Sequence, residues 1–225
     1  SINKQQYQKI INELNGAAVL VAVSKTKSIE DILALYDLGH RDFGENYVQE
    51  LVQKQEQLPK DINWHFIGHL QTNKVKYIVP FVHLIHGVDS EKLLHEINKQ
   101  GAKINRIIPC LLQIHISAEE TKFGFDEIEL DSLLSKLKTN EADFKNVSVK
   151  GLMGMASFTE DNDLIISEFN SLRRLFDKYS LSSTKNYKLQ TLSMGMSADY
   201  RFALDAGSNM VRIGSLLFGS RIYTK

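Results

Sequence analysis

The feature that most constrains the fold is a repeated unit, in which a short β-rich run is followed by a turn and then by apolar residues at helical spacing. Eight alternations of strand and helix favour a single (β/α)8 TIM barrel, an α/β fold that usually takes about 250 residues. The chain is slightly shorter, at 225 residues. The eight β-rich runs are 17–25, 41–46, 63–69, 83–89, 106–116, 147–157, 189–195 and 209–219.

A doubly wound open sheet is the alternative architecture. It is less favoured because no predicted strand is followed by a G-x-G-x-x-G loop, and because eight strands of nearly continuous apolar character close into a barrel more easily than they stack. An extra helix is expected at 5–14, before the first strand. Further helices are expected at 28–39, 90–101 and 197–207, each opening on a serine N-cap (Ser28, Ser90, Ser197) and closing on a glycine.

Composition and charge exclude several classes of protein. Lys plus Arg and Asp plus Glu number 27 each, so no basic excess indicates a nucleic-acid partner. No apolar stretch approaches the roughly 20 residues of a membrane helix, and no secretory leader is recognisable, so we expect a cytoplasmic protein. The single cysteine, Cys110, excludes a disulfide framework. No composition shift divides the chain, and residues 1–225 are expected to form one domain.

Lys25 ends the first predicted strand. The carboxyl ends of barrel strands meet at one mouth, where barrel proteins bind their ligands. Partial desolvation there would lower the pKa of the lysine below about 10.4, and a neutral amine forms Schiff bases with carbonyl compounds. The simpler alternative is a surface lysine whose stem covers the apolar wall while its amine stays in water.

Glycine and hydroxyl residues follow the seventh and eighth predicted strands, in "LSMGMSADY" and "VRIGSLLFGS". Barrels bind phosphate at these two turns through backbone amides and a helix N-terminus. Ser197, expected at such a terminus, and the amides of Gly214 and Ser215 could converge on one anion. Alternatively, the glycines only relieve crowding and Ser197 only caps its helix.

Arg212 lies two residues before Gly214, so strand alternation turns it toward the barrel interior. An unpaired guanidinium there would be very costly, which indicates a partner. A ligand with a phosphate, an aldehyde and an acceptor between them would engage the phosphate turns, Lys25 and Arg212 together. Pyridoxal 5'-phosphate (PLP) is such a molecule.

Six ordered blocks resemble the pyridoxal phosphate homeostasis protein family, the single-domain relatives of the alanine racemase N-terminal barrel. The likeness runs from about residue 17 to the end, although the N-terminal segment is somewhat short for the family. The blocks are "VAVSKTKS", "FGENYVQEL", "WHFIGHLQTNK", "GLMGM", "LSMGMSADY" and "VRIGSLLFG".

The resemblance implies a role for each matching position. Lys25 would form the Schiff base, and Arg212 would face the pyridine nitrogen. Ser215 stands where the family usually has threonine, which keeps the hydroxyl. The remaining cofactor-binding residues implied by the resemblance are Ser197, Gly214, Ser215 and Ser193 at the phosphate, Asn46 and His65 on the cofactor face, and Met155 beneath the ring.

The sequence favours a PLP carrier over an enzyme. Arginine keeps its proton near neutrality, so opposite the pyridine nitrogen it leaves that nitrogen unprotonated and the ring a poor electron sink. Racemases also use a tyrosine from a β-domain, and the chain ends six residues after Gly219. We therefore expect a monomer without catalytic residues that maintains intracellular vitamin B6 and amino- and keto-acid pools, with PLP as ligand and apo PLP enzymes as candidate recipients.

Three alternatives remain open. A PLP-dependent amino-acid racemase and a barrel aldolase that condenses with a phosphosugar both use a lysine such as Lys25. A structural interaction barrel leaves the interior arginine unexplained. Two histidine groups, His65 with His69 and His83 with His86 and Asp89, have spacings suited to a metal, but we expect no metal because no third ligand is apparent for the first pair.

Overall fold

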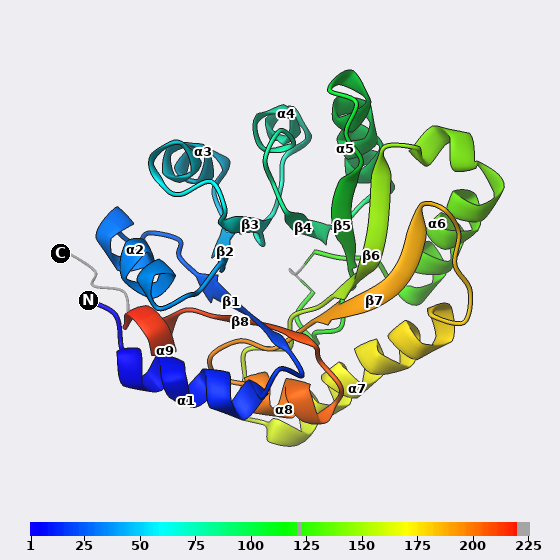
Figure 1. The fold of residues 1–225 in the computed structure, drawn as a ribbon. Coiled ribbons are helices and arrows are strands. Elements are labelled where there is room, and N and C mark those ends of the chain that lie inside the picture. The colour runs from blue at the N-terminus through cyan, green and yellow to red at the C-terminus, as the bar shows by residue number, and fades with distance from the viewer. Residues whose placement is uncertain (121–122, 220–225) are drawn as a thin grey trace.

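Eight parallel strands follow one another around a closed barrel, and the last pairs with the first (Figure 1). The computed structural model describes residues 1–120 and 123–219, so residues 121–122 and 220–225 of the predicted domain lie outside the described ranges. The strands are β1 (Val19–Val23), β2 (Asp42–Glu45), β3 (Asn63–Phe66), β4 (Leu84–Val88), β5 (Ile108–Gln113), β6 (Val147–Met153), β7 (Tyr187–Ser193) and β8 (Met210–Ile213).

Helices surround the strands, and α1 precedes β1, as Figure 1 shows. The predicted (β/α)8 barrel with an extra N-terminal helix is confirmed. No helix within the described ranges is long and apolar enough to cross a membrane. The helices are α1 (Lys4–Leu14), α2 (Ile29–Asp37), α3 (Val48–Gln57), η1 (Thr72–Lys74), α4 (Val75–Ile78), α5 (Glu91–Lys103), α6 (Glu127–Thr139), η2 (Glu141–Phe144), α7 (Asn162–Tyr179), α8 (Tyr200–Asp205) and α9 (Ser215–Phe218).

Local sequence explains where α2 and α5 begin. Ser28 caps α2 by accepting from the amide of Asp31 at 3.1 Å, and Ser90 caps α5 by accepting from Leu93 at 3.1 Å. Each bond satisfies one of the amides that a first helical turn leaves without a partner. Both predicted N-caps are confirmed.

Several predicted boundaries differ from the structure, and three of the differences have a local reason. The helix α5 continues through Gly101 to Lys103, because its buried face extends to Gly101. The helix α8 begins at Tyr200, not after Ser197, since a turn in which the Met196 amide donates to Asp199 at 2.7 Å precedes it. The predicted eighth strand ends at Ile213, and the rest of that segment forms the turn of α9.

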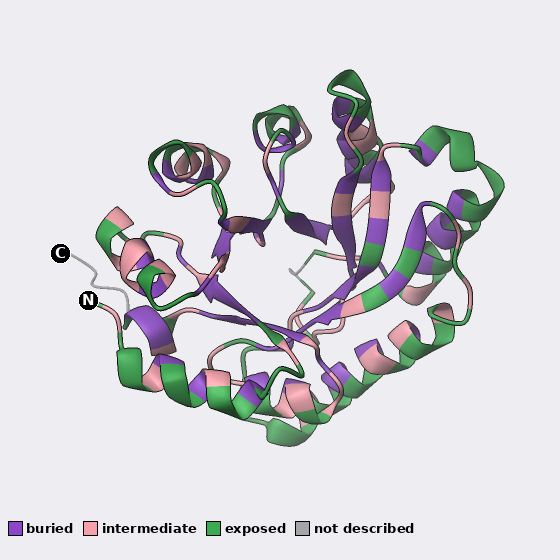
Figure 2. Ribbon diagram, viewed as in Figure 1, coloured by how far each residue is buried: buried purple, intermediate pink, exposed green. Residues whose placement is uncertain are grey.

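The buried residues form two layers, and Figure 2 shows the buried segments concentrated along the strands. The larger layer lies between the strands and the surrounding helices. A smaller apolar cluster fills the inside of the barrel with Val21, Leu84, Leu111, Met153 and Met210. Val21 belongs to this inner cluster, and side chains alternate along a strand, so Val23 also faces the inside of the barrel. The segment that follows Val23 leads to the mouth.

Candidate functional site

A cavity of about 360 Å³ lies where β1, β6, β7 and β8 end. This volume is within the usual range for small-molecule sites. Six of the nine predicted cofactor-binding residues line it: Lys25, Met155, Ser197, Arg212, Gly214 and Ser215. The other lining residues are Val23, Thr26, Lys27, Ala156, Ser157, Phe158, Met196, Ala198, Asp199 and Gly219.

Lys25 lies two residues beyond the end of β1 and is half-buried. Lys25 follows Val21 and Val23 in steps of two residues, so its side chain points to the same side of the strand and reaches the cavity. The next residue, Thr26, has a φ of +64°. Left-handed backbone is unusual for a β-branched residue and is found mainly where the surrounding structure holds it in place.

A buried polar network holds the segment that carries Lys25. The Ser24 hydroxyl donates to Glu45, and the Lys54 ammonium donates to the Ser24 carbonyl at 2.7 Å. Lys54 also forms an ion pair with Glu45 at 3.0 Å, and the amide of Thr26 donates to Glu50 at 2.7 Å. Hydrogen bonds from β2 and α3 therefore hold both residues that flank Lys25. The position of Lys25 is set by helix α3 as well as by β1.

Glu45 is the titratable centre of this network. It is fully buried, and burial raises its pKa from the ordinary 4.5 to about 7, even though Lys54 and the Ser24 hydroxyl favour the charged form. The Glu45 carboxyl therefore gains or loses its proton near neutral pH.

Arg212 is buried at the base of the cavity, with 3% of its surface exposed. One guanidinium nitrogen donates to the Ser193 hydroxyl and another to the Gly154 carbonyl at 3.2 Å. Burial lowers the pKa of Arg212 to about 10, and Asp199 opposes this shift. The side chain therefore remains a cation at neutral pH, and both of these bonds go to uncharged partners.

A chain of hydrogen bonds continues from Arg212 across the barrel interior. Ser193 Oγ lies 3.0 Å from His86 Nδ1, and His86 Nε2 lies 2.8 Å from His65 Nδ1. His65 Nε2 in turn lies 2.9 Å from an oxygen of Asp42. We refer to Arg212, Ser193, His86, His65 and Asp42 as the interior chain.

The two ends of the interior chain define where its protons lie. Arg212 can only donate, and the ionised Asp42 can only accept. With both histidines neutral, His65 donates to Asp42, His86 donates to His65, and the Ser193 hydroxyl donates to His86. Burial acts to raise the pKa of Asp42, but the hydrogen bond from His65 and the other polar neighbours of the carboxylate outweigh it, and the net shift is downward. Burial also lowers the pKa of His86 well below 6.5, which keeps it neutral.

Ser197 and Gly214 meet at the other side of the cavity. The amide of Gly214 donates to Ser197 Oγ at 3.3 Å, and helix α9 begins at the next residue, Ser215. The sequence predicted that Ser197 caps α8, and this prediction was wrong. Ser197 instead contacts the turn after β8. A Cβ at Gly214 would lie 3.2 Å from Cβ of Val23, so the turn packs closely on β1.

Three predicted cofactor-binding residues do not line the cavity. Ser193 and His65 lie deeper, in the interior chain, because β3 and β7 place them below the mouth. Asn46 follows β2, and its Oδ1 is buried without a hydrogen-bond partner among the described residues. The sequence analysis missed the network around Glu45 and the role of His86, whose only signal was a histidine at an inward-facing position of a strand.

Known proteins resemble this chain over most of its length. The alanine racemase N-terminal domain family matches residues 3–222. A pyridoxal phosphate homeostasis protein of Aquifex aeolicus is 41% identical over 209 residues, which cover 92% of this chain and 89% of that protein. The protein of the same name from Schizosaccharomyces pombe is 37% identical over 222 residues, with 97% and 90% covered.

Solved structures give the same result. PipY from Synechococcus elongatus, solved with PLP bound, has a TM-score of 0.85 and 30% identity, and the match covers 96% of this chain and 99% of PipY. An alanine racemase of Bartonella henselae, at 17% identity and a TM-score of 0.71, shares the fold.

The closed barrel and its cavity at the strand ends thus define a protein of the alanine racemase N-terminal domain class. Within that class, the chain belongs to the pyridoxal phosphate homeostasis protein family, as its six sequence blocks predicted.

Proposed function

We propose that the chain binds PLP in the cavity at the mouth of the barrel. The observation that carries this proposal is the placement of Lys25, Arg212 and the Ser197–Gly214 turn around one cavity of about 360 Å³. The donor set fits the cofactor, because it offers an amine, a buried cation and hydroxyl and amide groups beside a helix start. When bound, PLP supplies an aldehyde that a lysine amine can capture.

Each residue has a distinct part in this proposal. Lys25 would hold the aldehyde as a Schiff base, with loss of one water. Ser197, Gly214 and Ser215 hold the phosphate, and Arg212 donates to the pyridine nitrogen. Met155, which packs on the interior apolar cluster, lies beneath the ring.

The residues outside the cavity keep proposed roles as well. Ser193 and His65 act through Arg212, which they orient by way of the interior chain. Asn46 keeps its proposed place near the cofactor as a residue behind the cavity wall, where its Oδ1, which has no hydrogen-bond partner among the described residues, can accept a hydrogen bond.

Borohydride reduction followed by peptide mass spectrometry tests the binding proposal. We expect one reduced PLP adduct per chain, on Lys25, and its loss in Lys25→Ala. Lys27 is the matched control, since it also lines the cavity and lies two residues away. The Lys27→Ala variant is expected to keep the adduct, and an adduct on Lys27, or none in the wild type, would contradict the proposal.

We further propose that the protein is a carrier that serves PLP homeostasis and has no turnover of its own. The support is Arg212, which stays protonated and so leaves the pyridine nitrogen without a proton. The loaded protein should transfer PLP to an apo PLP enzyme and should not racemise L-alanine. Steady racemisation that Lys25→Ala abolishes would favour the enzyme alternative.

A further inference from the structure

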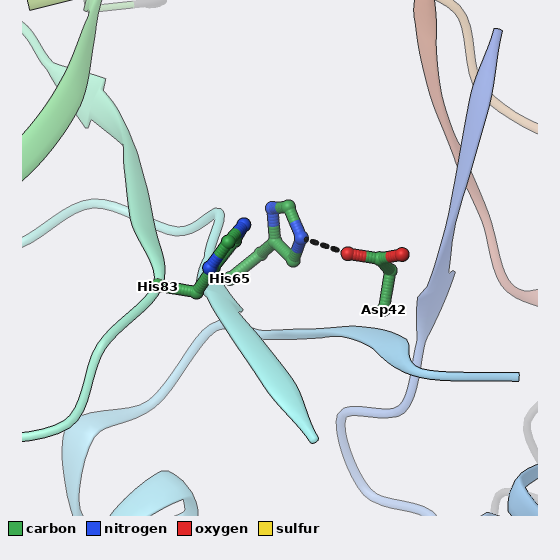
Figure 3. A group of neighbouring side chains, drawn as sticks. All are labelled: Asp42, His65 and His83. Atoms are coloured by element: carbon green, nitrogen blue, oxygen red, sulfur yellow. Dashed lines mark hydrogen bonds and ion pairs between the residues drawn. The ribbon is translucent and has the colours of Figure 1, made fainter. Parts of the chain in front are cut away.

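A second group of chemistry-bearing side chains lies away from the cavity. Asp42 is the first residue of β2, His65 lies on β3, and His83 immediately precedes β4. One ligand atom from each residue lies within 4.8 Å of those of the other two. Figure 3 shows the three side chains gathered together, with His65 bonded to Asp42.

The elements around this group place it at the opposite end of the barrel from the cavity. The amino-terminal ends of β2 and β4 carry Asp42 and His83, whereas the cavity lies where β1, β6, β7 and β8 end. Parallel strands in a closed barrel all run the same way, so their two sets of ends form two separate faces. None of the three residues lines the cavity.

The chemistry of the three side chains suits a transition-metal ion. Zn²⁺ binds imidazole nitrogens and carboxylate oxygens at about 2.0–2.2 Å, and two imidazoles favour a transition metal over Mg²⁺ or Ca²⁺. Ligand atoms around such an ion lie roughly 3–4 Å apart, and His65 and Asp42 already approach to 2.9 Å. The ligand atoms of all three residues lie within 4.8 Å of one another, and His83 is exposed, so its side chain has room to turn toward an ion.

The surroundings of His65 favour a ligand role as well. Its ring is buried, and the nitrogen that does not face Asp42 is 2.8 Å from His86 Nε2. Histidines that bind metals almost always donate the N–H of their second nitrogen in such a bond, which fixes the orientation of the ring. An ion at Nε2 of His65 would take the place of the proton there, and Nδ1 would then donate to His86 Nε2. Asp42 is held in the same way from the neighbouring strand, because Asn63 contacts its carboxylate at 3.4 Å.

We propose that Asp42, His65 and His83 form a binding site for one divalent transition-metal ion of the Zn²⁺ class. With three protein ligands, the fourth position of a tetrahedral ion is open to water on the exposed side of His83. The ion would tie together β2, β3 and β4, which are neighbours in the barrel.

The experiment uses the full, untagged chain, freed of metal with a chelator and prepared without PLP. Zn²⁺ binding is measured by calorimetry, and Co²⁺ is used as the spectroscopic probe of coordination. We expect one ion per chain in the wild type and an affinity about 100-fold or more weaker in His83→Ala, since even partners of metal ligands contribute roughly 10- to 100-fold.

His95 provides the matched control, because it is also an exposed histidine near a carboxylate, 3.8 Å from Glu91 on α5. His95→Ala should bind the ion as the wild type does. The site is overturned if the wild type binds no ion at micromolar concentration, if His83→Ala binds equally well, or if only His95→Ala loses binding. Because His83 is exposed, its variant should fold, and Asp42→Asn provides a second loss variant. The result does not depend on PLP, so either proposal can fail alone.

Discussion

Glu45 should make the stability of this protein depend on pH. It is fully buried at the last position of β2, where burial raises its pKa from 4.5 to about 7. Between these two pH values the unfolded chain has lost the proton while the folded protein still holds it. The contribution of Glu45 to the free energy of unfolding therefore decreases as the pH rises from 4.5 to about 7, and is constant above that range.

The size of this decrease follows from the two pKa values. Each pKa unit is worth about 1.4 kcal/mol, so a rise from 4.5 to about 7 corresponds to about 3 kcal/mol. The Glu45→Gln variant keeps the size of the side chain and an acceptor for Ser24 and Lys54, but it cannot titrate. We expect this decrease of about 3 kcal/mol to disappear in the variant.

Urea unfolding of the ligand-free protein at a series of pH values is the assay. The fluorescence of Trp64, the single tryptophan and a buried residue of β3, reports unfolding. Glu56→Gln, at an exposed position of helix α3, is the control and should keep the pH dependence of the wild type. If Glu45→Gln also kept that dependence, the pKa of Glu45 would be the same in the folded and the unfolded protein, and the attraction of Lys54 would balance the effect of burial.

Other substitutions test single contacts by their effect on the free energy of unfolding. Ser193→Ala breaks the interior chain and leaves buried groups of Arg212 and His86 without a partner, which should cost about 1–3 kcal/mol in urea unfolding. An unchanged midpoint would mean that water replaces the hydroxyl. Gly151→Ala should lower the melting temperature strongly, by at least about 2 kcal/mol in stability, because its Cβ would lie 1.7 Å from a backbone oxygen of Thr191. A wild-type melting curve would show that β6 and β7 can separate there. Tyr200→Phe removes the 2.6 Å bond to Glu13 that joins α8 to α1, which we expect to cost about 1 kcal/mol; no loss would indicate that Arg201 alone holds Glu13.

The sequence predicted the order of elements and the composition of the cavity wall better than it predicted polar contacts. Strand and helix periodicity depend on neighbours in the chain, so all eight strands and the caps at Ser28 and Ser90 were identified. The inward direction of Arg212 followed from strand alternation alone. These inferences require no knowledge of contacts between distant segments.

Contacts between segments distant in sequence were beyond such reasoning. Ser197 had the appearance of a helix cap, but its hydroxyl instead meets Gly214, which is 17 positions away. Glu45 and Lys54 form a buried pair only because α3 folds back over β2. The spacing of histidines also could not reveal the group of Asp42, His65 and His83, since its carboxylate comes from a different strand.

The pairing of β1 with β8 has a consequence for how the protein acquires its binding site. Val19 pairs with Met210, so this contact joins the two strands of the barrel that lie farthest apart in the sequence. Contacts of such high sequence separation carry a large loop-closure entropy and form slowly. The cavity straddles this junction, with Lys25 from one side and Arg212 from the other. A nascent chain therefore has no complete ligand site until β8 has been synthesised and has docked on β1, and any ligand bound there bridges these two strands.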